Sequence, residues 1–188
     1  EIAPIRCSGY TDTLKGRETA PSMRWHLTLY RKKMDPKDIS NKTFTAALPD
    51  TSGTFRFNGI DASIDIFRDG YGIPHVWAQT VHDAFFGQGF ATAQDRLWHM
   101  DYDRRHAYGR LAEWLGADAV DKDITMRRFG IGTTVERDYQ AVDADTRAML
   151  DAYAAGVNAF IDTTDRLPVE YRMLDSAPEP WQAWDCFA

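Results

Sequence analysis

Four side chains of metal-binding types recur at steps of three or four residues in the middle of the sequence, a spacing that places them on one face of a helix. They are Asp95, His99, Asp103 and His106. Imidazole nitrogens and carboxylate oxygens bind Zn²⁺, so a metal-dependent hydrolase that uses His99 and His106 is one hypothesis. No His-Glu-x-x-His motif accompanies them, however, and an arginine follows each aspartate, at Arg96 and Arg104. The sequence therefore favours ion-paired carboxylates and predicts no metal site in this chain.

His75 is a second candidate for chemistry, because it follows Pro74 next to a turn and could act as a general base. A base needs a nucleophile within hydrogen-bond reach, and no serine or cysteine lies nearby in a nucleophile context. The chain also lacks a Gly-x-Ser-x-Gly elbow. We therefore predict a structural histidine that bonds backbone groups of a hairpin.

The Gly87-x-Gly89 pair is not a dinucleotide-binding motif, because the third glycine is missing and no acidic residue closes a βαβ unit. Both glycines fall within a helical pattern. This position predicts close helix packing rather than a phosphate site.

Aromatic side chains offer two interpretations, as the lining of a pocket or as core. The set comprises Trp98, Trp114, Trp181 and Trp184. A pocket would support a non-catalytic, aromatic-rich binding module, which is the alternative function that the sequence allows.

The elements that would position these residues begin with a hairpin. Residues 64–67 and 73–78 are β-type runs on either side of an Asp-Gly turn, where glycine supplies a positive φ. Pro74 lacks an N–H, so the second run is expected to lie at the edge of a sheet or to begin past the proline.

A further β run precedes this hairpin. Residues 53–57 alternate between apolar and polar types and end at Asn58-Gly59, a strong turn signal. Residues 60–67 could pair back against them. Together the runs predict a small antiparallel β region near residues 53–78.

Helical patterns occupy most of the remaining chain. Thr80 and Asp83 resemble a capping box before a long helix, and Gly116 is placed as the stop of a second segment. Gly156 costs about 1 kcal/mol against alanine inside a helix, which predicts close approach of another backbone. Further helices are predicted at residues 118–129 and 133–142 and from the Asp143 cap to Ile161, followed by an extended Pro/aromatic linker at residues 178–185.

The first 47 residues contain several helix-breaking glycines and prolines and are predicted to form an N-terminal extension or arm, with one strand or extended segment at residues 23–30. Residues 48–188 are assigned to a second, separate domain. Cys7 and Cys186 lie near opposite ends, and the sequence leaves open whether they form a disulfide or two free thiols.

Composition narrows the class of protein. The 188 residues carry a net charge of −6, with acidic and basic residues interspersed, which argues against nucleic acid or an anionic membrane as partner. No apolar run reaches the ~20 residues of a transmembrane helix. Six Trp and ten Phe residues are ample for a hydrophobic core.

Two strings carry a specific resemblance: RDGYGIPHVWA, then GQGFATAQDRLWHMDYDRRHAYGRLAEWLG. Together they resemble the α chain of the penicillin acylase family of N-terminal-nucleophile hydrolases, from about Leu48 to Ala188. The motif residues are Arg68, Asp69, Gly72, Pro74, His75, Gly89, Gln94, Asp95, Arg96, Arg104, Arg105, Gly109, Glu113 and Gly116. The resemblance implies that these residues serve the fold, with Gln94, Asp95 and Arg96 in a buried polar network that joins helix to sheet.

The resemblance also implies an α+β fold, namely the mostly helical α-subunit portion of an αββα sandwich. The catalytic residue would be the N-terminal Ser, Thr or Cys of a companion β chain released by self-processing of the same precursor. This chain begins with Glu1, so no catalytic residue is expected in it. The substrate would be an N-acyl amide of the β-lactam, acyl-homoserine lactone or anilide type.

The family's acyl-pocket residues follow the Trp-x-x-aromatic-Asp group, and the sequence ends soon after that group, at Ala188. Substrate-binding residues are therefore left unassigned in this chain. The resemblance implies no cofactor within this chain, allows calcium in the assembled enzyme, and places that enzyme in the periplasm or outside a bacterial cell.

Overall fold

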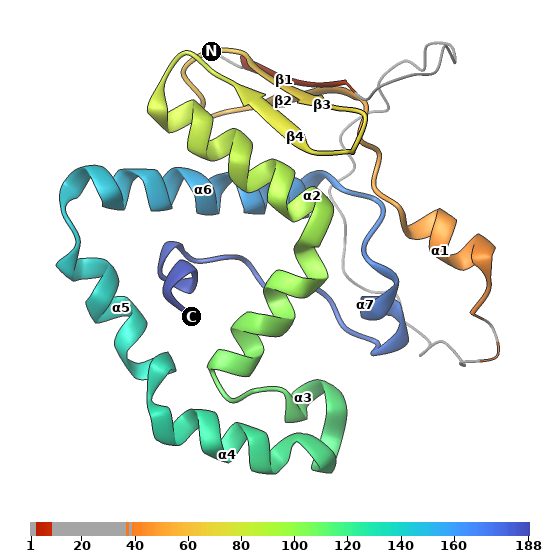
Figure 1. Cartoon of the computed structure of the whole chain (residues 1–188), viewed down its shortest axis with the longest axis vertical. Coiled ribbons are helices and arrows are strands. Elements are labelled where there is room, and N and C mark those ends of the chain that lie inside the picture. The colour runs from red at the N-terminus through yellow and green to blue at the C-terminus, as the bar shows by residue number, and fades with distance from the viewer. Residues whose placement is uncertain (1–2, 9–36, 38) are drawn as a thin grey trace.

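The structure is a computed structural model that describes residues 3–8, 37 and 39–188. A small sheet lies at one end, and the long helix α2 (Val81–Ala107) runs from beneath it toward the opposite end (Figure 1). Helix α6 (Ala144–Thr163) crosses α2 close to the sheet. The expected α+β class, mostly helical with a small sheet, is confirmed.

The remaining elements are short. The strands are β1 (Ala3–Ser8), β2 (Gly53–Phe57), β3 (Ile64–Arg68) and β4 (Pro74–Trp77). The other helical segments are α1 (Asn41–Ala47), α3 (Ala112–Leu115), η2 (Gly116–Ala119), α4 (Val120–Phe129), α5 (Ile131–Ala141), α7 (Val169–Met173) and η3 (Ala183–Phe187).

The sheet is mixed rather than antiparallel, with the strand order β2-β1-β3-β4. Strand β1 lies parallel to β3 and antiparallel to β2, so Ile5 is aligned with both Ile64 and Phe55. The prediction that residues 60–67 pair back against residues 53–57 is therefore wrong, because β1 from the first residues of the chain is inserted between them. This pairing is long-range and leaves no local signal.

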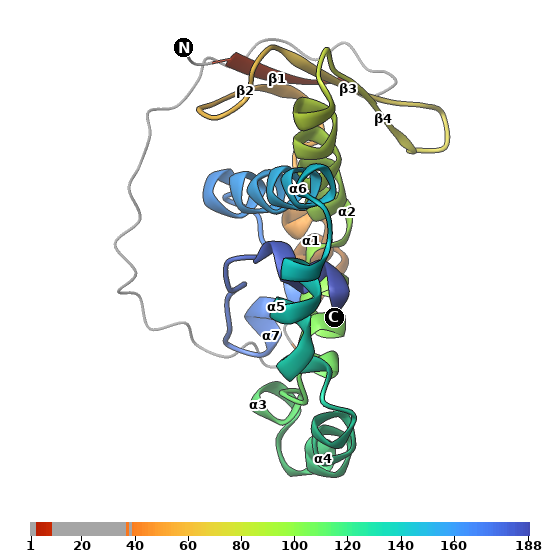
Figure 2. The same cartoon turned by 90° about the vertical axis from the view of Figure 1, so that its left-hand side faces the viewer.

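The second predicted hairpin is confirmed. Strands β3 and β4 are antiparallel, with Arg68 opposite Pro74, and β4 is an edge strand as the proline requires. Along β3 the side chains alternate, so that Ile64 and Ile66 are buried while Phe67 on the opposite face is half exposed. The buried face packs against α2 (Figure 2).

Helix α2 begins as predicted. The Thr80 hydroxyl accepts a hydrogen bond from the backbone N–H of Asp83 at 3.1 Å. The Asp83 carboxylate does not complete the capping box, because it accepts the backbone N–H groups of Asp61 and Ala62 at 2.8 and 2.9 Å. The aspartate thus ties the loop before β3 to the start of the helix.

Glycines set the crossing of α2 and α6. A Cβ atom on Gly89 would lie 2.0 Å from the carbonyl oxygen of Tyr153, and one on Gly156 would lie 1.9 Å from that of Phe86. Both predictions of close packing are confirmed, since the two backbones touch where side chains are absent. Phe90 and Val157 are fully buried beside this contact.

The later helices follow the predicted order with shifted ends. Helix α4 begins at Val120 after the short η2 segment, and α5 begins at Ile131 rather than beyond Gly132. The Asp143 carboxylate caps α6 by accepting the N–H of Thr146 at 2.9 Å. Helix α7, with the fully buried Tyr171, was not predicted.

Two expectations concern the first part of the chain. The strand or extended segment predicted at residues 23–30 lies outside the described residues. The boundary at residue 47 stays a prediction, although β1 occupies an interior position in the sheet. Within residues 3–8, 37 and 39–188, helices that are both long and apolar enough to span a bilayer are absent.

Candidate functional site

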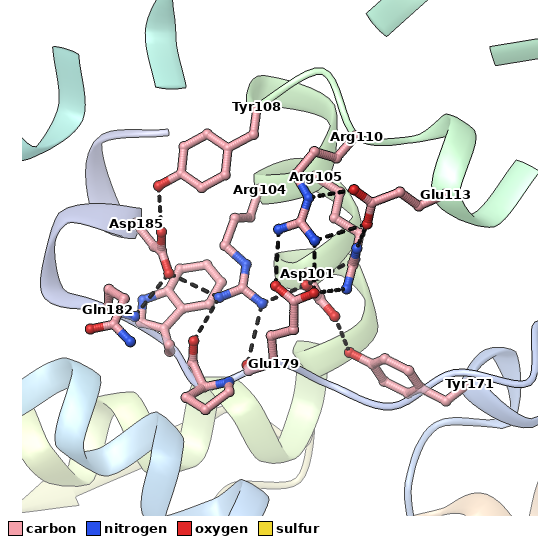
Figure 3. Close-up of polar contacts among 12 residues, drawn as sticks. Asp101, Arg104, Arg105, Tyr108, Arg110, Glu113, Tyr171, Glu179, Gln182 and Asp185 are labelled. Carbon is pink, nitrogen blue, oxygen red and sulfur yellow. Dashed lines mark hydrogen bonds and ion pairs between the residues drawn. The ribbon is translucent and has the colours of Figure 1, made fainter. Parts of the chain in front are cut away.

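The C-terminal half of α2 carries a cluster of buried charge, shown in Figure 3. It combines arginines from α2 and the turn after it with carboxylates from α2, α3 and the C-terminal segment. We call this set the arginine cluster. Its members are Asp101, Arg104, Arg105, Arg110, Glu113, Glu179 and Asp185.

Arg104 is the centre of the cluster, with a side chain that is 5% exposed. Its guanidinium donates to Asp101 Oδ1 at 2.6 Å and to Asp185 Oδ2 at 2.9 Å. It also donates to the carbonyl oxygens of Pro180 and Glu179 at 3.0 and 3.3 Å. Burial alone would lower the pKa of Arg104, but the two carboxylates outweigh burial and raise it, so the group stays charged.

Arg105 and Arg110 share two glutamates at the more exposed side of the cluster. Arg105 donates to Glu113 at 2.6 Å and to Glu179 at 2.8 Å. Arg110 donates to the same two glutamates, at 2.7 Å to Glu113 and at 2.8 Å to Glu179. The hydrogen bond from Arg110 is the main cause that lowers the pKa of Glu179 to about 2.

Two tyrosines complete the cluster. Tyr171 donates to Asp101 Oδ2 at 2.9 Å, and Tyr108 donates to Asp185. Burial, reinforced by these carboxylates, raises the pKa of both phenols above their usual range. The cluster therefore holds no carboxylate free to act as a base, and its role is to fix residues 179–185 against α2.

A second network joins the hairpin to α2. Arg68, which is 8% exposed, donates to Gln94 Oε1 at 2.7 Å and pairs with Asp95 at 2.7 Å. It also donates to the carbonyl oxygen of Gly72 at 3.0 Å, while Gln94 donates to that of Asp50 at 2.7 Å. The network between helix and sheet implied by the family resemblance is present for Gln94 and Asp95.

Arg96, which the resemblance placed in the same buried network as Gln94 and Asp95, is not part of it. It is exposed, and its φ of −140° and ψ of 19° break the regular geometry of α2. The break follows directly after the two residues held by Arg68. Arg96 also lines a cleft with a volume of about 910 Å³. The walls of this cleft come from α1, the β3–β4 turn, the middle of α2 and the start of α7.

The predicted partners of the aspartates are wrong in detail. Asp95 pairs with Arg68 rather than with Arg96, and Arg104 pairs with Asp101 and Asp185 rather than with Asp103. Neighbouring residues on a helix point about 100° apart, so an aspartate and the arginine next to it do not face each other. The predicted class of interaction, an ion-paired carboxylate, is nevertheless what the structure contains.

The histidines take part in local pairs. His75 Nε2 lies 3.2 Å from Asp69 Oδ2, so this structural histidine contacts a carboxylate rather than the predicted backbone groups. His99 lies 3.2 Å from Asp103, with both side chains more than half exposed. His106 is partly buried and packs beside the ring of Tyr102. The three histidines therefore lie in separate local pairs and do not form a common site.

One group of potential metal ligands is brought together by the fold, but it is poorly suited to bind a metal ion. Within the described residues, three donors lie within 4.8 Å of one another at Asp61, His82 and Asp83. Both Asp83 oxygens already accept backbone N–H groups, and Ca²⁺ prefers oxygen ligands over imidazole. We assign no calcium ligand among residues 3–8, 37 and 39–188.

The tryptophans pack mainly against protein. Trp98 stacks on Trp114 with centroids 4.4 Å apart, and both meet the ring of Tyr171 edge-on. Trp181 lies beneath the Arg104 guanidinium, with the cation 4.9 Å from its ring centroid. Trp184 meets Tyr139 at 6.0 Å. Trp98 also borders the cleft.

Neither cysteine is bonded or activated. Cys7 is buried in β1, where burial raises its pKa to about 11. Cys186 in η3 is an exposed residue, and partial desolvation of its thiol raises its pKa. The open question of a disulfide is answered in favour of free thiols.

Apart from Gly89 at the α2–α6 crossing and Arg96 beside the cleft, the motif residues separate into two groups. The first surrounds the hairpin and its contact with α2, at Arg68, Asp69, Gly72, Pro74, His75, Gln94 and Asp95. The second belongs to the end of α2, at Arg104, Arg105, Gly109, Glu113 and Gly116. The sequence did not single out Asp101, Tyr171 or Glu179, although Asp101 lies one helical turn before Arg104, a spacing that suits an ion pair.

Comparison with known proteins identifies the fold. The penicillin amidase family model matches residues 63–188. The penicillin acylase 2 proenzyme of Pseudomonas sp. (strain SE83) is 48% identical over 143 residues, which are 76% of this chain and 18% of that protein. The acyl-homoserine lactone acylase QuiP of Pseudomonas fluorescens is 34% identical over 139 residues, or 73% of this chain and 17% of the relative.

A solved structure agrees with these matches. The thermostable penicillin G acylase from Alcaligenes faecalis superposes with a TM-score of 0.60 and 35% identity, covering 66% of this chain and 68% of that chain. The chain therefore belongs to the penicillin amidase family. It spans less than a fifth of the length of the curated relatives described above.

Proposed function

We propose that this chain is the α subunit of a self-processed, heterodimeric amidohydrolase that cleaves the amide bond of an N-acyl substrate. The observation that carries the proposal is the 48% identity to a penicillin acylase proenzyme of which this chain corresponds to a small part. The buried networks of the family motif give the chain a structural role in such an assembly.

The lengths of the relatives support cleavage of a precursor. The aligned region covers 68% of the matched chain in the Alcaligenes faecalis structure but only 18% of the penicillin acylase 2 proenzyme. A solved acylase chain that is much shorter than a related proenzyme fits a precursor that is cut into two chains.

The mechanism requires a nucleophile from that companion. Hydrolysis of an amide needs an activated nucleophile and a base, and in the described residues the two thiols have raised pKa values. In the proposed enzyme the N-terminal Ser, Thr or Cys of the β chain attacks the amide carbonyl. Its own α-amine takes up the proton of the attacking group.

The relatives support one substrate class over the others. The higher identity to a penicillin acylase than to an acyl-homoserine lactone acylase favours an N-acyl β-lactam over an acyl-homoserine lactone or an anilide. As part of the same proposal, the assembled enzyme is periplasmic or secreted and can hold calcium.

Intact mass spectrometry of the full-length gene product from its native host tests the proposal. We expect a chain that contains this sequence together with a larger chain that begins with Ser, Thr or Cys. Replacing that first residue by alanine should abolish hydrolysis of a panel containing an N-acyl β-lactam, an acyl-homoserine lactone and an anilide. Amide hydrolysis by the isolated chain, or recovery of this chain with no companion, contradicts the proposal.

A further inference from the structure

The Asn58-Gly59 pair has no part in the proposed function. It directly follows strand β2 and begins the loop that leads to β3. The chain contains three asparagines, Asn41, Asn58 and Asn158, and only Asn58 precedes a glycine. Both residues of the pair are exposed and lie outside the strands. They therefore meet water without the restraint of a regular element.

The two groups that could react with each other are the Asn58 side-chain amide and the Gly59 backbone nitrogen. Within the described residues, neither group makes a hydrogen bond. Gly59 has a φ of 84°, and a Cβ atom built on it would meet nothing within 4 Å outside its chain neighbours. Because glycine has no side chain, its nitrogen is open to the amide beside it.

The other two asparagines are held in helices. Asn158 lies in α6, where its side-chain amide donates to the Trp181 carbonyl oxygen at 2.8 Å and accepts the Trp181 N–H at 2.7 Å. Asn41 is the first residue of α1. A helical side chain leans toward the N-terminus of its helix, away from the backbone nitrogen of the next residue. These two amides are therefore poorly placed for the same reaction.

The Asp69-Gly70 pair is a useful contrast, because an aspartate can close the same ring with loss of water. The Asp69 carboxylate accepts the N–H groups of Tyr71 and Ile73 at 2.9 and 3.0 Å. It also lies 3.2 Å from His75, a hydrogen bond that lowers the pKa of Asp69. The carboxylate is thus fixed by other partners and stays an anion, which a backbone nitrogen attacks poorly.

We propose that Asn58 is a site of spontaneous deamidation that forms isoaspartate. The Gly59 nitrogen attacks the side-chain amide carbon of Asn58, so that a new N–C bond forms and the C–NH2 bond breaks. The proton of the Gly59 N–H leaves with the departing amine as ammonia, and a five-membered succinimide ring remains. Water then opens the ring at either carbonyl, which yields aspartate or isoaspartate. Water is the only other reactant.

Isoaspartate lengthens the backbone by a CH2 group immediately before a fixed loop. Ile60 is buried, and the Asp83 carboxylate holds the N–H groups of Asp61 and Ala62 at 2.8 and 2.9 Å. The longer connection displaces this loop relative to β2, so these two hydrogen bonds weaken. The inference is independent of the proposed function, because it uses only residues of this chain.

Ageing of the full-length gene product tests the site. The purified protein is incubated in mildly alkaline buffer, because the attack requires loss of the Gly59 amide proton. Isoaspartate is detected by methylation with protein isoaspartyl methyltransferase and is located by peptide mass spectrometry. We expect it at Asn58 and not at Asn41, Asn158 or Asp69.

Asn58→Gln is the matched control for ageing, because glutamine has to close a larger ring, and it should abolish the methylation signal. Absence of isoaspartate at Asn58 in the aged wild type overturns the inference. An undiminished signal in Asn58→Gln overturns it as well.

Amide hydrogen exchange tests the effect on the loop. The N–H groups of Asp61 and Ala62 should exchange faster in the aged protein than in fresh protein. Asn58→Asp carries the added charge on an ordinary backbone, so it should exchange like fresh wild type. Equal exchange in aged and fresh protein, or equally fast exchange in Asn58→Asp, overturns the assignment of the effect to the longer backbone.

Discussion

At the scale of single residues, this chain uses its charged groups to join distant segments. Arg104 contacts Asp185, which lies 81 positions later, and Arg68 contacts Asp95 across 27 positions. These guanidiniums are almost fully buried, and each is paired with carboxylates in bidentate or shared geometry. Breaking one partner of such a pair leaves a buried charge unpaired, which is far more costly than losing a surface pair.

Arg104→Met should therefore lower the free energy of unfolding by about 3–5 kcal/mol, because Asp101 and Asp185 lose their shared cation. Urea denaturation followed by tryptophan fluorescence measures the change. Arg137→Met is the control: that arginine has a side chain that is 74% exposed and pairs with its neighbour Asp138, so the loss should stay within about 1 kcal/mol. Equal losses would show that the cluster adds nothing to stability.

Glu179 should make stability depend on acid pH. The arginines lower its folded pKa to about 2 from an ordinary value of 4.5. Its contribution is therefore complete above pH 4.5 and is lost as the pH falls from 4.5 toward 2. In Glu179→Gln the urea midpoint should fall less steeply across this window than in wild type, whereas Glu136→Gln, an exposed glutamate of α5, should keep the wild-type slope.

At the scale of elements, the contact between α2 and α6 organises the molecule. The two helices touch backbone to backbone at Gly89 and Gly156, and the sheet packs on the same end of α2. A glycine inside a helix lowers stability relative to alanine. Because a glycine lies on each side of this crossing, the close packing of the two helices must contribute more stability than the two glycines cost.

Gly156→Ala should destabilise the chain even though alanine is the better helix former. Its Cβ would meet the Phe86 carbonyl oxygen at 1.9 Å, so the helices must separate. Overpacking of this kind costs about 1–3 kcal/mol, which should appear as a lower Tm by differential scanning calorimetry. Gly70→Ala, which meets nothing within 4 Å, should leave Tm nearly unchanged. A Tm raised by Gly156→Ala would contradict the argument.

Elements with local signals could be predicted from the sequence. The β3–β4 hairpin, the Thr80 start of α2, the Gly116 stop and the Asp143 cap depend on residues within a few positions of one another. Helix α7 has no such local signal, because it is one short turn and its buried Tyr171 contacts Asp101 and the paired tryptophans of the distant α2–α3 region.

The sequence predicted which residues belong to the candidate site, but not which of them contact one another. Nothing local indicates that Arg104 reaches Asp185 or that Arg68 reaches Gln94, because the fold brings these segments together over long sequence distances. The cleft was missed for the same reason: its walls come from α1, the β3–β4 turn, α2 and α7.

At the scale of the whole molecule, the first described residues of the chain complete the sheet. Strand β1 lies between β2 and β3 and supplies the fully buried Ile5, so residues 3–8 complete a sheet whose other strands come from residues 53–77. A strand in the interior of a sheet differs from an appended arm, because its removal would leave β2 and β3 without a common neighbour.

Ile5→Asp tests whether β1 is integral. A charge buried at this position has no partner among the apolar residues of the sheet core, so we expect loss of cooperative unfolding and of amide-exchange protection in both β2 and β3. Arg6→Ala is the control on the opposite face: Arg6 forms an exposed pair with Asp65 at 3.5 Å and should cost less than about 1 kcal/mol. If Ile5→Asp leaves the protection of β3 intact, the first residues are a dispensable arm; if protection is lost across both neighbours, the structural domain begins at the start of β1 and not at residue 48.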